Sequence, residues 1–537
     1  MLVFPSLGSQ IEVAYGRSGG SGCPWNITLY PESAGRSIYF LLIDELPART
    51  FPAFASAGGA CLSLPSLRGQ GGEVDPLSTA PPLVMSVCNF LHLDRVLRQW
   101  DVLLPLGLRL DTSALSTPFR AKEYRSMRSK KLSIGLTAVL AILMVTLLAT
   151  ATRAFAQQET VLYNFGTHGK DSRFTFASVV FDTAGNLYAT AFNGGIYGLG
   201  TVFELTPNPG GSWDETIIHS FGGSAQDGTL PHANLIFDAI GNLYSTTYYG
   251  GAYNDGTVFE LTPRPGGGWM EKILHNFNGG DGQAPLGGLI FDSAGNLYGT
   301  TSGGGSQGGG TAFELTPNVN GGWTERVLHN FDQTDGHYPF SSLIFDTAGN
   351  LYGTTQVGGA YNGGTVFELR PAVGKGWAEK VLYSFNGTAG TVPDCSLIFD
   401  AAGNLYGTAA EGGAYNAGTV FELMPTVGDN WTLSVLHTFD PLVNDGVEPS
   451  AGLIFDASGN LYGTTYYGGT YGAGTAFELT PTGGGNWTET VLNNFNYSGG
   501  KGIAPYASLI LDSAGNLYGT TYTGGVHGHG TVFEITP

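Results

Sequence analysis

The chain has 537 residues, of which 84 are glycine, and only 12% carry a charged side chain. Its 43 acidic residues outnumber its 23 Lys and Arg, which leaves a net charge of −20 at pH 7. An acidic surface repels phosphate backbones and anionic lipid headgroups, so we expect neither a nucleic-acid partner nor peripheral membrane binding.

Residues 127–156 have the three parts of a secretory signal peptide: a basic start, an apolar run and a small-residue cleavage motif. These parts are Met127 with Arg128, Lys130 and Lys131, then the run 132–151, then Ala154-Phe155-Ala156. We therefore predict that the signal peptide exports the remainder, 157–537, to the cell envelope or the extracellular space.

Signal peptides normally begin at the initiator methionine, which makes Met127 the predicted start of the natural protein. Residues 1–126 are then a spurious upstream extension or a poorly ordered segment. N-terminal sequencing of the natural protein tests this, because a chain beginning near Gln157 supports it and peptides from 1–126 contradict it.

The alternative keeps 1–126 as a genuine domain and makes 132–151 an uncleaved signal anchor, since about 20 apolar residues can span a bilayer. Membrane contact is expected only in this case. In both cases the basic flank lies on the N-terminal side of the apolar run, so the rest of the chain is directed out of the cytoplasm.

Seven copies of a block D-x-x-G-N-L-Y organise residues 157–537. Successive block aspartates are 54 or 56 residues apart, namely Asp182, Asp238, Asp292, Asp346, Asp400, Asp456 and Asp512. So constant a period indicates one structural unit copied seven times.

The repeat region is acidic and has a single cysteine. From residue 158 onward there are 9 Lys and Arg against 33 Asp and Glu. Cys395 is the only cysteine there, which excludes an internal disulfide and suggests a small buried residue.

Each unit, for example 289–331, holds four short runs rich in β-branched and aromatic residues, separated by Gly, Asn, Asp and Pro. No run has a helical period. Four strands in a repeat of this length are typical of a propeller blade. The last unit stops after its third run, and a matching fourth run, 159–165, precedes the first unit. The predicted fold is all-β, a monomeric seven-bladed β-propeller of four-stranded antiparallel blades whose ring is closed by the N-terminal outer strand.

Residues present in all seven units are interpreted as structural, because a single active site should break the repeat. The block aspartate is expected to close an Asx turn, with Gly and Asn supplying positive φ. The third run has one glutamate per unit, expected to accept structural hydrogen bonds: Glu204, Glu260, Glu314, Glu368, Glu422, Glu478 and Glu534. Four histidines of the fourth run are interpreted as blade packing: His219, His275, His329 and His437.

Three motifs recur together: F-D-x-x-G-N-L-Y-G-T-T, G-G-x-Y-x-x-G-T-x-F-E-L-T-P and G-W-x-E-x-V-L-x-x-F. In this combination 158–537 resembles the GloVer (Gloeo-Verruco) tandem repeat of bacterial surface and secreted proteins. The resemblance implies export and brings no established activity with it. A looser similarity to kelch-type propellers, in the Gly-Gly after the second strand and the tryptophan further on, supports the fold class alone.

Ligand binding is expected on the face shared by the loops from the second to the third strand and from the fourth strand to the next blade. Tyrosines offer flat apolar faces and carboxylates accept hydrogen bonds from hydroxyls, so these loops suit carbohydrate or another polar polymer. The candidates are Tyr197, Tyr253, Tyr361, Tyr415, Tyr471, Asp227, Asp281, Asp335 and Asp445. The competing interpretation is structural, with tyrosines packing the loops and Asp-Gly forming turns.

Departures from the repeat are more informative. His527 stands where most units have the loop tyrosine, and His529 follows it, so both join the candidates. A lone H-x-H in one glycine-rich loop lacks an evident third ligand. We predict no metal, no cofactor and no catalytic residue.

Three functions compete. We expect a binding or scaffold propeller at the bacterial cell surface that recognises glycan or a cell-surface protein. The alternative is an extracellular carbohydrate-active enzyme, a hydrolase or lyase, which needs paired carboxylates that depart from the repeat on the ligand face. A metal- or cofactor-dependent oxidoreductase has little support from one cysteine and scattered histidines.

Overall fold

The computed structural model describes residues 158–536, apart from 373 and 375, together with six short strands between residues 2 and 85. The chain divides into two compact units, Met1–Ser129 and Lys130–Pro537. In the first, strands pair in the order β1-β2-β3-β6, and β4 pairs with β5. Their bounds are β1 (Leu2–Phe4), β2 (Ser9–Glu12), β3 (Ile27–Leu29), β4 (Tyr39–Ile43), β5 (Pro52–Ser56) and β6 (Leu83–Met85).

The predicted signal peptide, 127–156, lies outside the described residues, as does most of 1–126. Within the described part of the chain, no helix has the length and apolar character needed to cross a membrane.

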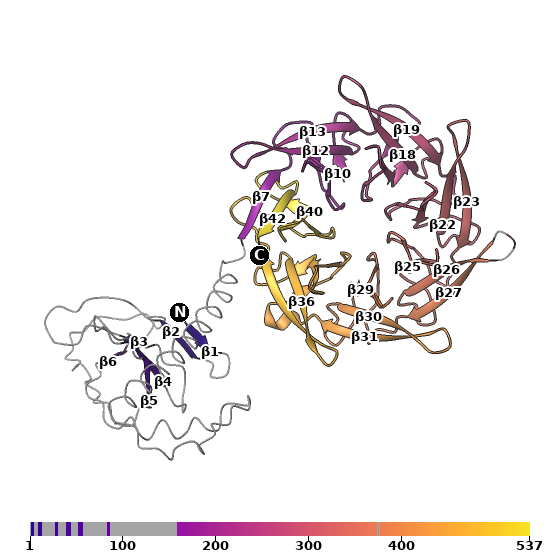
Figure 1. Ribbon diagram of the computed structural model, residues 1–537. Helices are drawn as coiled ribbons and strands as arrows, with labels where there is room; N and C mark the ends of the chain where they lie inside the picture. The colour runs from indigo at the N-terminus through magenta and orange to yellow at the C-terminus, as the bar shows by residue number, and fades with distance from the viewer. Residues whose placement is uncertain are drawn as a thin grey trace, which may run out of the picture. The chain divides into compact units, whose positions relative to one another are not determined.

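The second unit is a ring of seven four-stranded antiparallel sheets, so the predicted seven-bladed propeller is confirmed (Figure 1). Blade 1 consists of β9 (Val180–Phe181), β10 (Leu187–Ala191), β12 (Thr201–Pro207) and β13 (Trp213–Ser220). Blades 2 to 4 are β15 (Ile236–Phe237), β16 (Leu243–Thr247), β18 (Thr257–Pro263), β19 (Trp269–Asn276); β20 (Ile290–Phe291), β21 (Leu297–Thr301), β22 (Thr311–Pro317), β23 (Trp323–Asn330); and β24 (Ile344–Phe345), β25 (Leu351–Thr355), β26 (Thr365–Ala372), β27 (Gly376–Ser384).

Blades 5 and 6 repeat this arrangement, and blade 7 is completed from both ends of the repeat region. Their strands are β28 (Ile398–Phe399), β29 (Leu405–Ala409), β30 (Thr419–Thr426), β31 (Asn430–Thr438); β33 (Ile454–Phe455), β34 (Leu461–Thr465), β36 (Thr475–Gly483), β37 (Asn486–Asn494); and β39 (Ile510–Leu511), β40 (Leu517–Thr521), β42 (Thr531–Thr536) with β7 (Gln158–Asn164).

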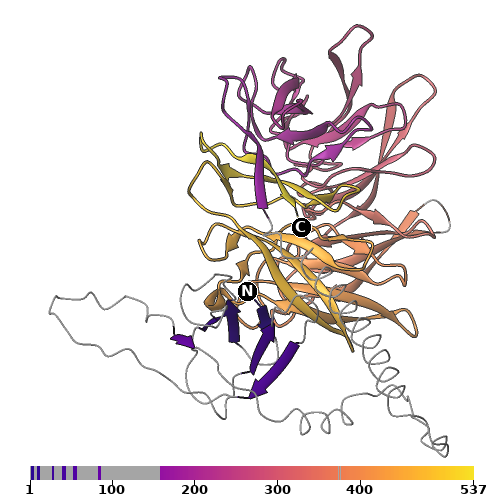
Figure 2. The same ribbon diagram turned by 60° about the vertical axis from the view of Figure 1, so that its left-hand side comes forward.

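The seam of the ring is the pairing of β7 with β42, which confirms the predicted closure (Figure 1, Figure 2). Asn164 lies opposite Thr531, and Glu159 lies opposite Ile535. Phe165, just after β7, is fully buried and its ring centroid lies 5.2 Å from that of Phe203 in blade 1. Closure therefore leaves no unpaired outer strand in blade 7 and also completes the core between blades 7 and 1.

Aromatic pairs hold neighbouring blades together. At each interface a fully buried phenylalanine that follows the fourth strand packs against a phenylalanine in the third strand of the next blade, with centroids 5.1 Å apart for Phe221 and Phe259. Six of the seven pairs are edge-on, and Phe331 with Phe367 is tilted. Such edge-to-face pairs contribute about 0.5–1.5 kcal/mol each beyond their buried area. Two phenylalanines in each repeat thus supply seven similar contacts around the ring.

The block aspartates close the hairpin between the first two strands, as predicted. The block glycines have positive φ, 84° at Gly295, but the block asparagines do not, so that part of the prediction was wrong. In blade 3, Asp292 accepts hydrogen bonds from the amides of Ala294 and Asn296, both at 2.9 Å. The Tyr298 hydroxyl lies 3.2 Å from Asp292 and 2.9 Å from Glu314. The same Asp, Tyr and Glu meet in all seven blades. The third-strand glutamates are therefore structural acceptors, which confirms that prediction.

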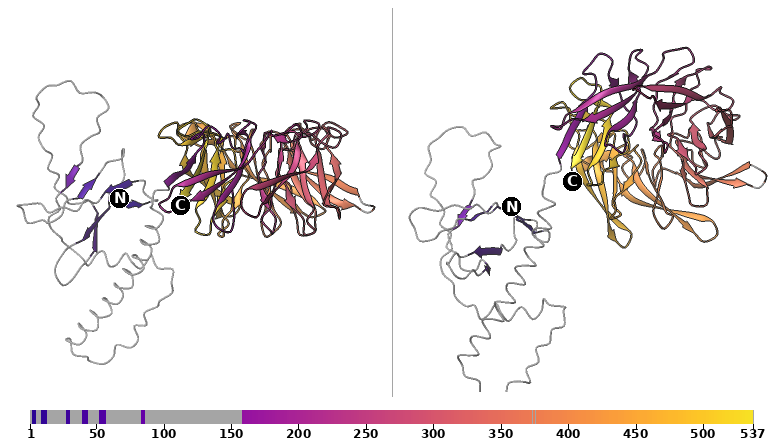
Figure 3. Two further views of the ribbon diagram at one scale, coloured as in Figure 1. Left: turned by 90° about the horizontal axis from the view of Figure 1, so that it is seen from above. Right: turned by 45° about the horizontal axis from the view of Figure 1, so that its top comes forward.

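Short ladders join the two loops on which ligand binding is predicted. In four blades two-stranded sheets pair the incoming loop with the loop between the second and third strands: β8 (Ser172–Arg173) with β11 (Asn193–Gly194), β14 (Gly228–Thr229) with β17 (Tyr249–Gly250), β32 (Gly446–Val447) with β35 (Tyr467–Gly468), and β38 (Gly502–Ile503) with β41 (Thr523–Gly524). Isolated bridges make the same connection in the other three blades. These two loops of each blade therefore lie on the same face of the ring, called here the loop face. Seen edge-on, the ring has loops on both of its faces (Figure 3).

Candidate functional site

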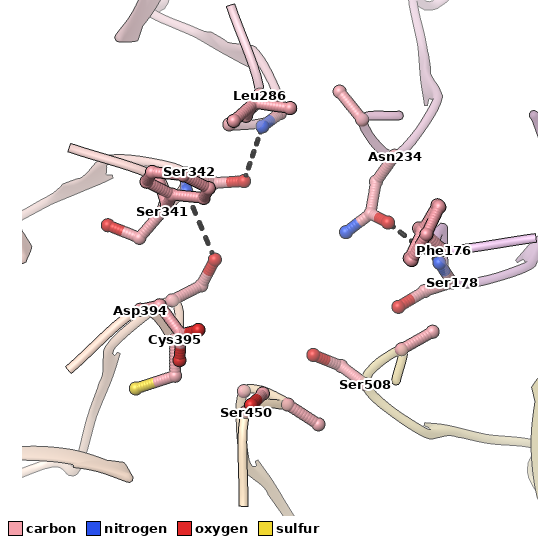
Figure 4. Close-up of a pocket in the computed structure, with 18 of the residues that line it drawn as sticks. Phe176, Ser178, Asn234, Leu286, Ser341, Ser342, Asp394, Cys395, Ser450 and Ser508 are labelled. Atoms are coloured by element: carbon pink, nitrogen blue, oxygen red, sulfur yellow. Dashed lines mark hydrogen bonds between the residues drawn. The ribbon is translucent and has the colours of Figure 1, made fainter. Parts of the chain in front are cut away.

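The centre of the ring is a channel lined by three consecutive residues from each of six blades and by Phe176 and Ser178 of blade 1, in each case just before the first strand. The residue of each triplet nearest the loop face forms what we call the first ring: Phe176, His232, Leu286, Phe340, Asp394, Ser450 and Tyr506. Figure 4 looks into this cavity, with Phe176, Leu286 and Asp394 among the labelled side chains. The first strand is thus the innermost one, as the prediction of a ligand face assumed.

The two deeper rings are small and internally bonded. The middle ring consists of alanine, glycine, serine and Cys395. In six blades its main-chain carbonyl accepts from a threonine of the preceding blade, as from Thr354 to Cys395 at 3.0 Å. In the deep ring, Ser178 donates its amide to Asn234 at 2.7 Å (Figure 4). These bonds bind blade to blade, so large and variable side chains are confined to the channel mouth.

Aromatic rings from blades 7, 1 and 2 cover one side of the mouth. Phe176 stacks on His232 and on Tyr522, with centroids 4.5 Å away in both cases. Its edges meet Tyr506 at 5.3 Å and Phe192 at 5.4 Å. Burial lowers the pKa of His232 to about 4, so its ring is uncharged at neutral pH. This side therefore offers flat apolar faces with hydroxyl and imidazole edges.

Carboxyl groups from blades 5 and 6 occupy the neighbouring side. Burial, reinforced by Glu448 and Glu411, raises the pKa of Asp394 to about 7. The Asp394 Oδ1 atom is buried and has no hydrogen-bond partner among the described residues. Burial and then Asp394 also raise the pKa of Tyr506, and Glu448 contributes to the raised pKa of Tyr466. The aromatic and acidic sides therefore meet at these two tyrosines.

The main chain fixes Glu448 at the mouth. Its φ of 58° lies in the left-handed region, which a residue with a Cβ adopts at a cost of about 1–2 kcal/mol. Two hydrogen bonds hold it there: its amide donates to the Ala417 carbonyl, and its carbonyl accepts from the Tyr466 amide, each at 3.0 Å. The corresponding loop residue of every other blade is also left-handed, so the carboxylate uses a position that the fold already constrains.

The mouth combines two kinds of chemistry. Aromatic faces stack on the apolar faces of sugar rings, and carboxylates accept hydrogen bonds from hydroxyl or ammonium groups. A carboxyl group with a pKa of about 7 is present in both protonation states near neutral pH, so Asp394 can donate or accept a proton.

The structure places the predicted loop tyrosines at the outer rim of the loop face, away from the channel lining. All five are half-exposed or more: Tyr197, Tyr253, Tyr361, Tyr415 and Tyr471. None belongs to the residues around the channel. Their role in ligand binding stays a prediction.

The predicted loop aspartates face the interfaces between blades. Asp281, Asp335 and Asp445 lie 3.2, 2.9 and 2.9 Å from the Nε2 atoms of a fourth-strand histidine. The fourth, Asp227, is only 7% exposed and lies beside His219. Their surroundings are those of structural partners, and ligand binding by them is untested.

His527 is exposed in its loop, and His529 is half-buried. The His529 ring packs edge-on against Phe174 at 5.4 Å, and its carbonyl accepts the Phe174 amide at 2.9 Å. Burial, with Arg173 and His527 nearby, lowers the pKa of His529. The pair thus closes the loop face at the seam, and a ligand role remains a prediction.

Sequence reasoning missed the first ring. The signal was present in the sequence. In six units a proline directly precedes this position, and an apolar strand begins after two further residues. The position itself nevertheless holds six residue types in seven units. A position that varies between two constant anchors marks a place where the fold makes no demand on the side chain.

Comparison with solved structures gives distant likenesses. A putative 6-phosphogluconolactonase from Bacteroides uniformis is 12% identical, with a TM-score of 0.39, over 68% of this chain and 89% of that chain. An ancestral GH74 enzyme is 12% identical, with a TM-score of 0.47, over 71% and 51%. A PL25 ulvan lyase bound to a saccharide is 10% identical, with a TM-score of 0.43, over 70% and 95%. Likeness at this level carries no information about activity.

No curated protein matches the chain. The model of the Gloeobacter/Verrucomicrobia repeat matches residues 150–347, 241–441 and 346–537. Since these matches together cover all seven repeats, the chain belongs to the Gloeobacter/Verrucomicrobia repeat family.

Proposed function

We propose that the chain is an exported β-propeller that binds a neutral or cationic carbohydrate at its channel mouth, as a binding or scaffold module of the bacterial cell surface. One observation carries the proposal: at the channel mouth the aromatic rings around Phe176 lie on one side, and Asp394 of the first ring, with Glu448 and Glu411 near it, supplies carboxyl groups on the neighbouring side. Asp394, Glu448 and Glu411 disfavour uronic or sulfated sugars by charge repulsion. Export is supported by the basic, apolar and cleavage-like segments of residues 127–156.

A glycan array probed with the purified chain tests the proposal. Neutral and amino sugars should bind, and sulfated or uronic chains should not. Phe176→Ala should weaken binding about 10-fold or more, because truncating a central aromatic anchor typically costs more than 1 kcal/mol. The matched control is Tyr253→Ala at the exposed rim, which should bind like the unchanged protein. Loss of binding in Tyr253→Ala alone would move the site from the channel to the rim.

A carbohydrate-active enzyme is the second candidate, and a specific observation favours it. Asp394 and Glu448 are carboxyl groups that depart from the repeat and share the channel mouth, and Asp394 retains a proton near neutral pH. A protonated acid beside a second carboxylate is the arrangement required for acid and base catalysis on a glycosidic bond.

Incubating each array hit with the chain and measuring new reducing ends and unsaturated products separates the two functions. If Asp394 acts as the general acid, turnover should fall as the pH rises through about 7, and Asp394→Asn should abolish it. Binding without any product identifies a binding module.

A further inference from the structure

Three side chains meet in the interface between blades 1 and 2, away from the channel. His219 lies on β13, Asp227 in the following loop, and Glu271 on β19 of the next blade. His219 Nε2 is 3.6 Å from both Asp227 Oδ1 and Glu271 Oε1. The three ligand atoms lie within 4.8 Å of one another. A histidine and two carboxylates from neighbouring blades thus converge on one point.

The other six interfaces show which side chains accompany one another at these three positions. Three keep His, Asp and Glu: His275, Asp281, Glu325; His329, Asp335, Glu379; and His437, Asp445, Glu489. Between blades 4 and 5 the acids are replaced by Ala389 and Leu433, and the histidine by Tyr383. Between blades 7 and 1 both acids, Asp171 and Glu215, are kept, and the hydroxyl of Tyr163 in the histidine position lies 3.3 Å from each. Wherever both carboxylates are present, a side chain that can donate a hydrogen bond lies beside them, so the groups serve one another or a shared partner.

The interface between blades 6 and 7 shows what that partner can be. There Lys501 takes the place of the aspartate, and its ammonium lies 3.0 Å from Glu159 Oε2, the counterpart of Glu271. Asn493, in the histidine position, donates to the same Glu159 oxygen at 2.9 Å. The protein therefore places a positive charge against this glutamate where the sequence provides one.

The triad between blades 1 and 2 differs from the three similar ones in being open. Elsewhere Nε2 of the histidine lies 2.9–3.2 Å from the aspartate, which is hydrogen-bond distance. Here the separations of 3.6 Å are too long for a hydrogen bond. His219 Nε2, Asp227 Oδ1 and Glu271 Oε1 are all buried without a hydrogen-bond partner among the described residues. Asp227 itself is only 7% exposed, and its other oxygen is fixed by the Gly223 amide at 2.8 Å.

These separations match a metal site. Zinc bonds of about 2.0–2.1 Å in a tetrahedron place neighbouring ligand atoms about 3.4 Å apart. One neutral imidazole and two carboxylates also balance the charge of a divalent ion. Calcium instead prefers six to eight oxygen ligands, so the imidazole nitrogen favours a transition metal.

We propose that His219 Nε2, Asp227 Oδ1 and Glu271 Oε1 bind one divalent transition-metal ion, with Zn²⁺ the best fit, which cross-links blades 1 and 2. The fourth position is open to water. The competing occupant is a proton shared by the triad, since burial and Asp227 raise the pKa of Glu271 to about 7. The test must therefore distinguish metal binding from protonation.

The purified chain is stripped with a chelator and dialysed against Zn²⁺ at about pH 7.5, because metal binding competes with protons, and its bound zinc is counted. One tightly bound equivalent is expected, with a higher melting temperature than the stripped protein. Replacing Zn²⁺ with Co²⁺ should give the intense visible absorption of four-coordinate cobalt. His219→Gln should lose the bound ion and both effects, a weakening of more than about 100-fold, since even outer-shell changes weaken metal sites about 10–100-fold.

His329→Gln is the matched control, because His329 is hydrogen-bonded to its aspartate at 2.9 Å, and it should keep the zinc. Glu271→Gln is the second ligand variant, for use if His219→Gln does not fold. The proposal is overturned if the stripped chain takes up no zinc, or if both ligand variants that fold still bind it with unchanged affinity. A melting temperature that responds to pH but not to zinc identifies the proton as the occupant.

Discussion

At the scale of single residues, the first ring shows what a repeat permits. The same backbone position carries Phe176 in blade 1 and Asp394 in blade 5, and the strands beside it are unchanged. Side chains there point into the channel, so they can vary without disturbing the packing between blades. Asp394 is nevertheless placed at a cost, because one of its oxygens is buried without a partner.

Asp394→Asn should therefore stabilise the protein while weakening carbohydrate binding. A raised folded-state pKa means that the stability linked to this group is present below about pH 4 and lost as the pH rises through about 7. Removing the charge should raise the free energy of unfolding by about 1–3 kcal/mol at pH 8, allowing for the opening to the channel, and change little at pH 4. Urea unfolding at both pH values measures this, alongside carbohydrate binding. An equal effect at both pH values would contradict the raised pKa.

At the scale of elements, the hairpin between the first two strands is the part that local sequence determines best. Its aspartate, glycine and asparagine lie within five residues, so turn chemistry alone predicts their contacts. The tyrosine and glutamate that complete the cluster recur with it and were also predicted to be structural. The orientation of Asp227 and its equivalents was harder to foresee, because it depends on a histidine across the loop and a glutamate from the next blade.

Asp292→Ala should destabilise blade 3 without affecting ligand binding. The aspartate accepts from two amides and from the Asn296 side chain, the last at 2.7 Å. Leaving these donors without their acceptor should lower the free energy of unfolding by about 2–3 kcal/mol. Urea denaturation gives the value, and Ser293→Ala in the same turn is the control. A loss of carbohydrate binding at unchanged stability would show that the turn contributes to the site.

At the scale of the whole molecule, the channel mouth arises from residues that are far apart in the chain. Asp394, Glu448, Tyr506 and Phe176 come from four blades and become neighbours only when the ring is complete. No local pattern encodes that proximity. The sequence therefore predicted the ring, its seam and its loop face, whereas the composition of the mouth required the arrangement of the blades.

The interfaces between blades should make the ring most stable at mildly acidic pH. Burial raises the pKa to about 7 for one glutamate at each of five interfaces: Glu215, Glu271, Glu325, Glu379 and Glu489. Their contribution is complete below about pH 4.5 and is lost as the pH rises through about 7. Block aspartates such as Asp292 have the opposite linkage, because burial is outweighed by hydrogen bonds that lower its pKa.

The free energy of unfolding, measured with chelator present, should therefore be highest at about pH 5. It should fall by several kcal/mol toward pH 8, with each glutamate contributing on the order of 1 kcal/mol. Glu325→Gln should flatten part of that slope. A maximum at pH 8 would mean that these glutamates ionise normally in the folded protein.

The pairing of β7 with β42 also determines when the ring can close. Along the chain, β7 is the first strand of the propeller and β42 the last, so β7 lacks its partner until the whole repeat region has been synthesised. Phe165 remains uncovered for that whole period, since its socket forms only when blade 7 docks on blade 1. An incomplete chain therefore exposes the apolar edge around Phe165, which a protease or chaperone can recognise. Once the final strand pairs with β7, that edge is covered. The seam acts as a built-in check that the molecule is whole.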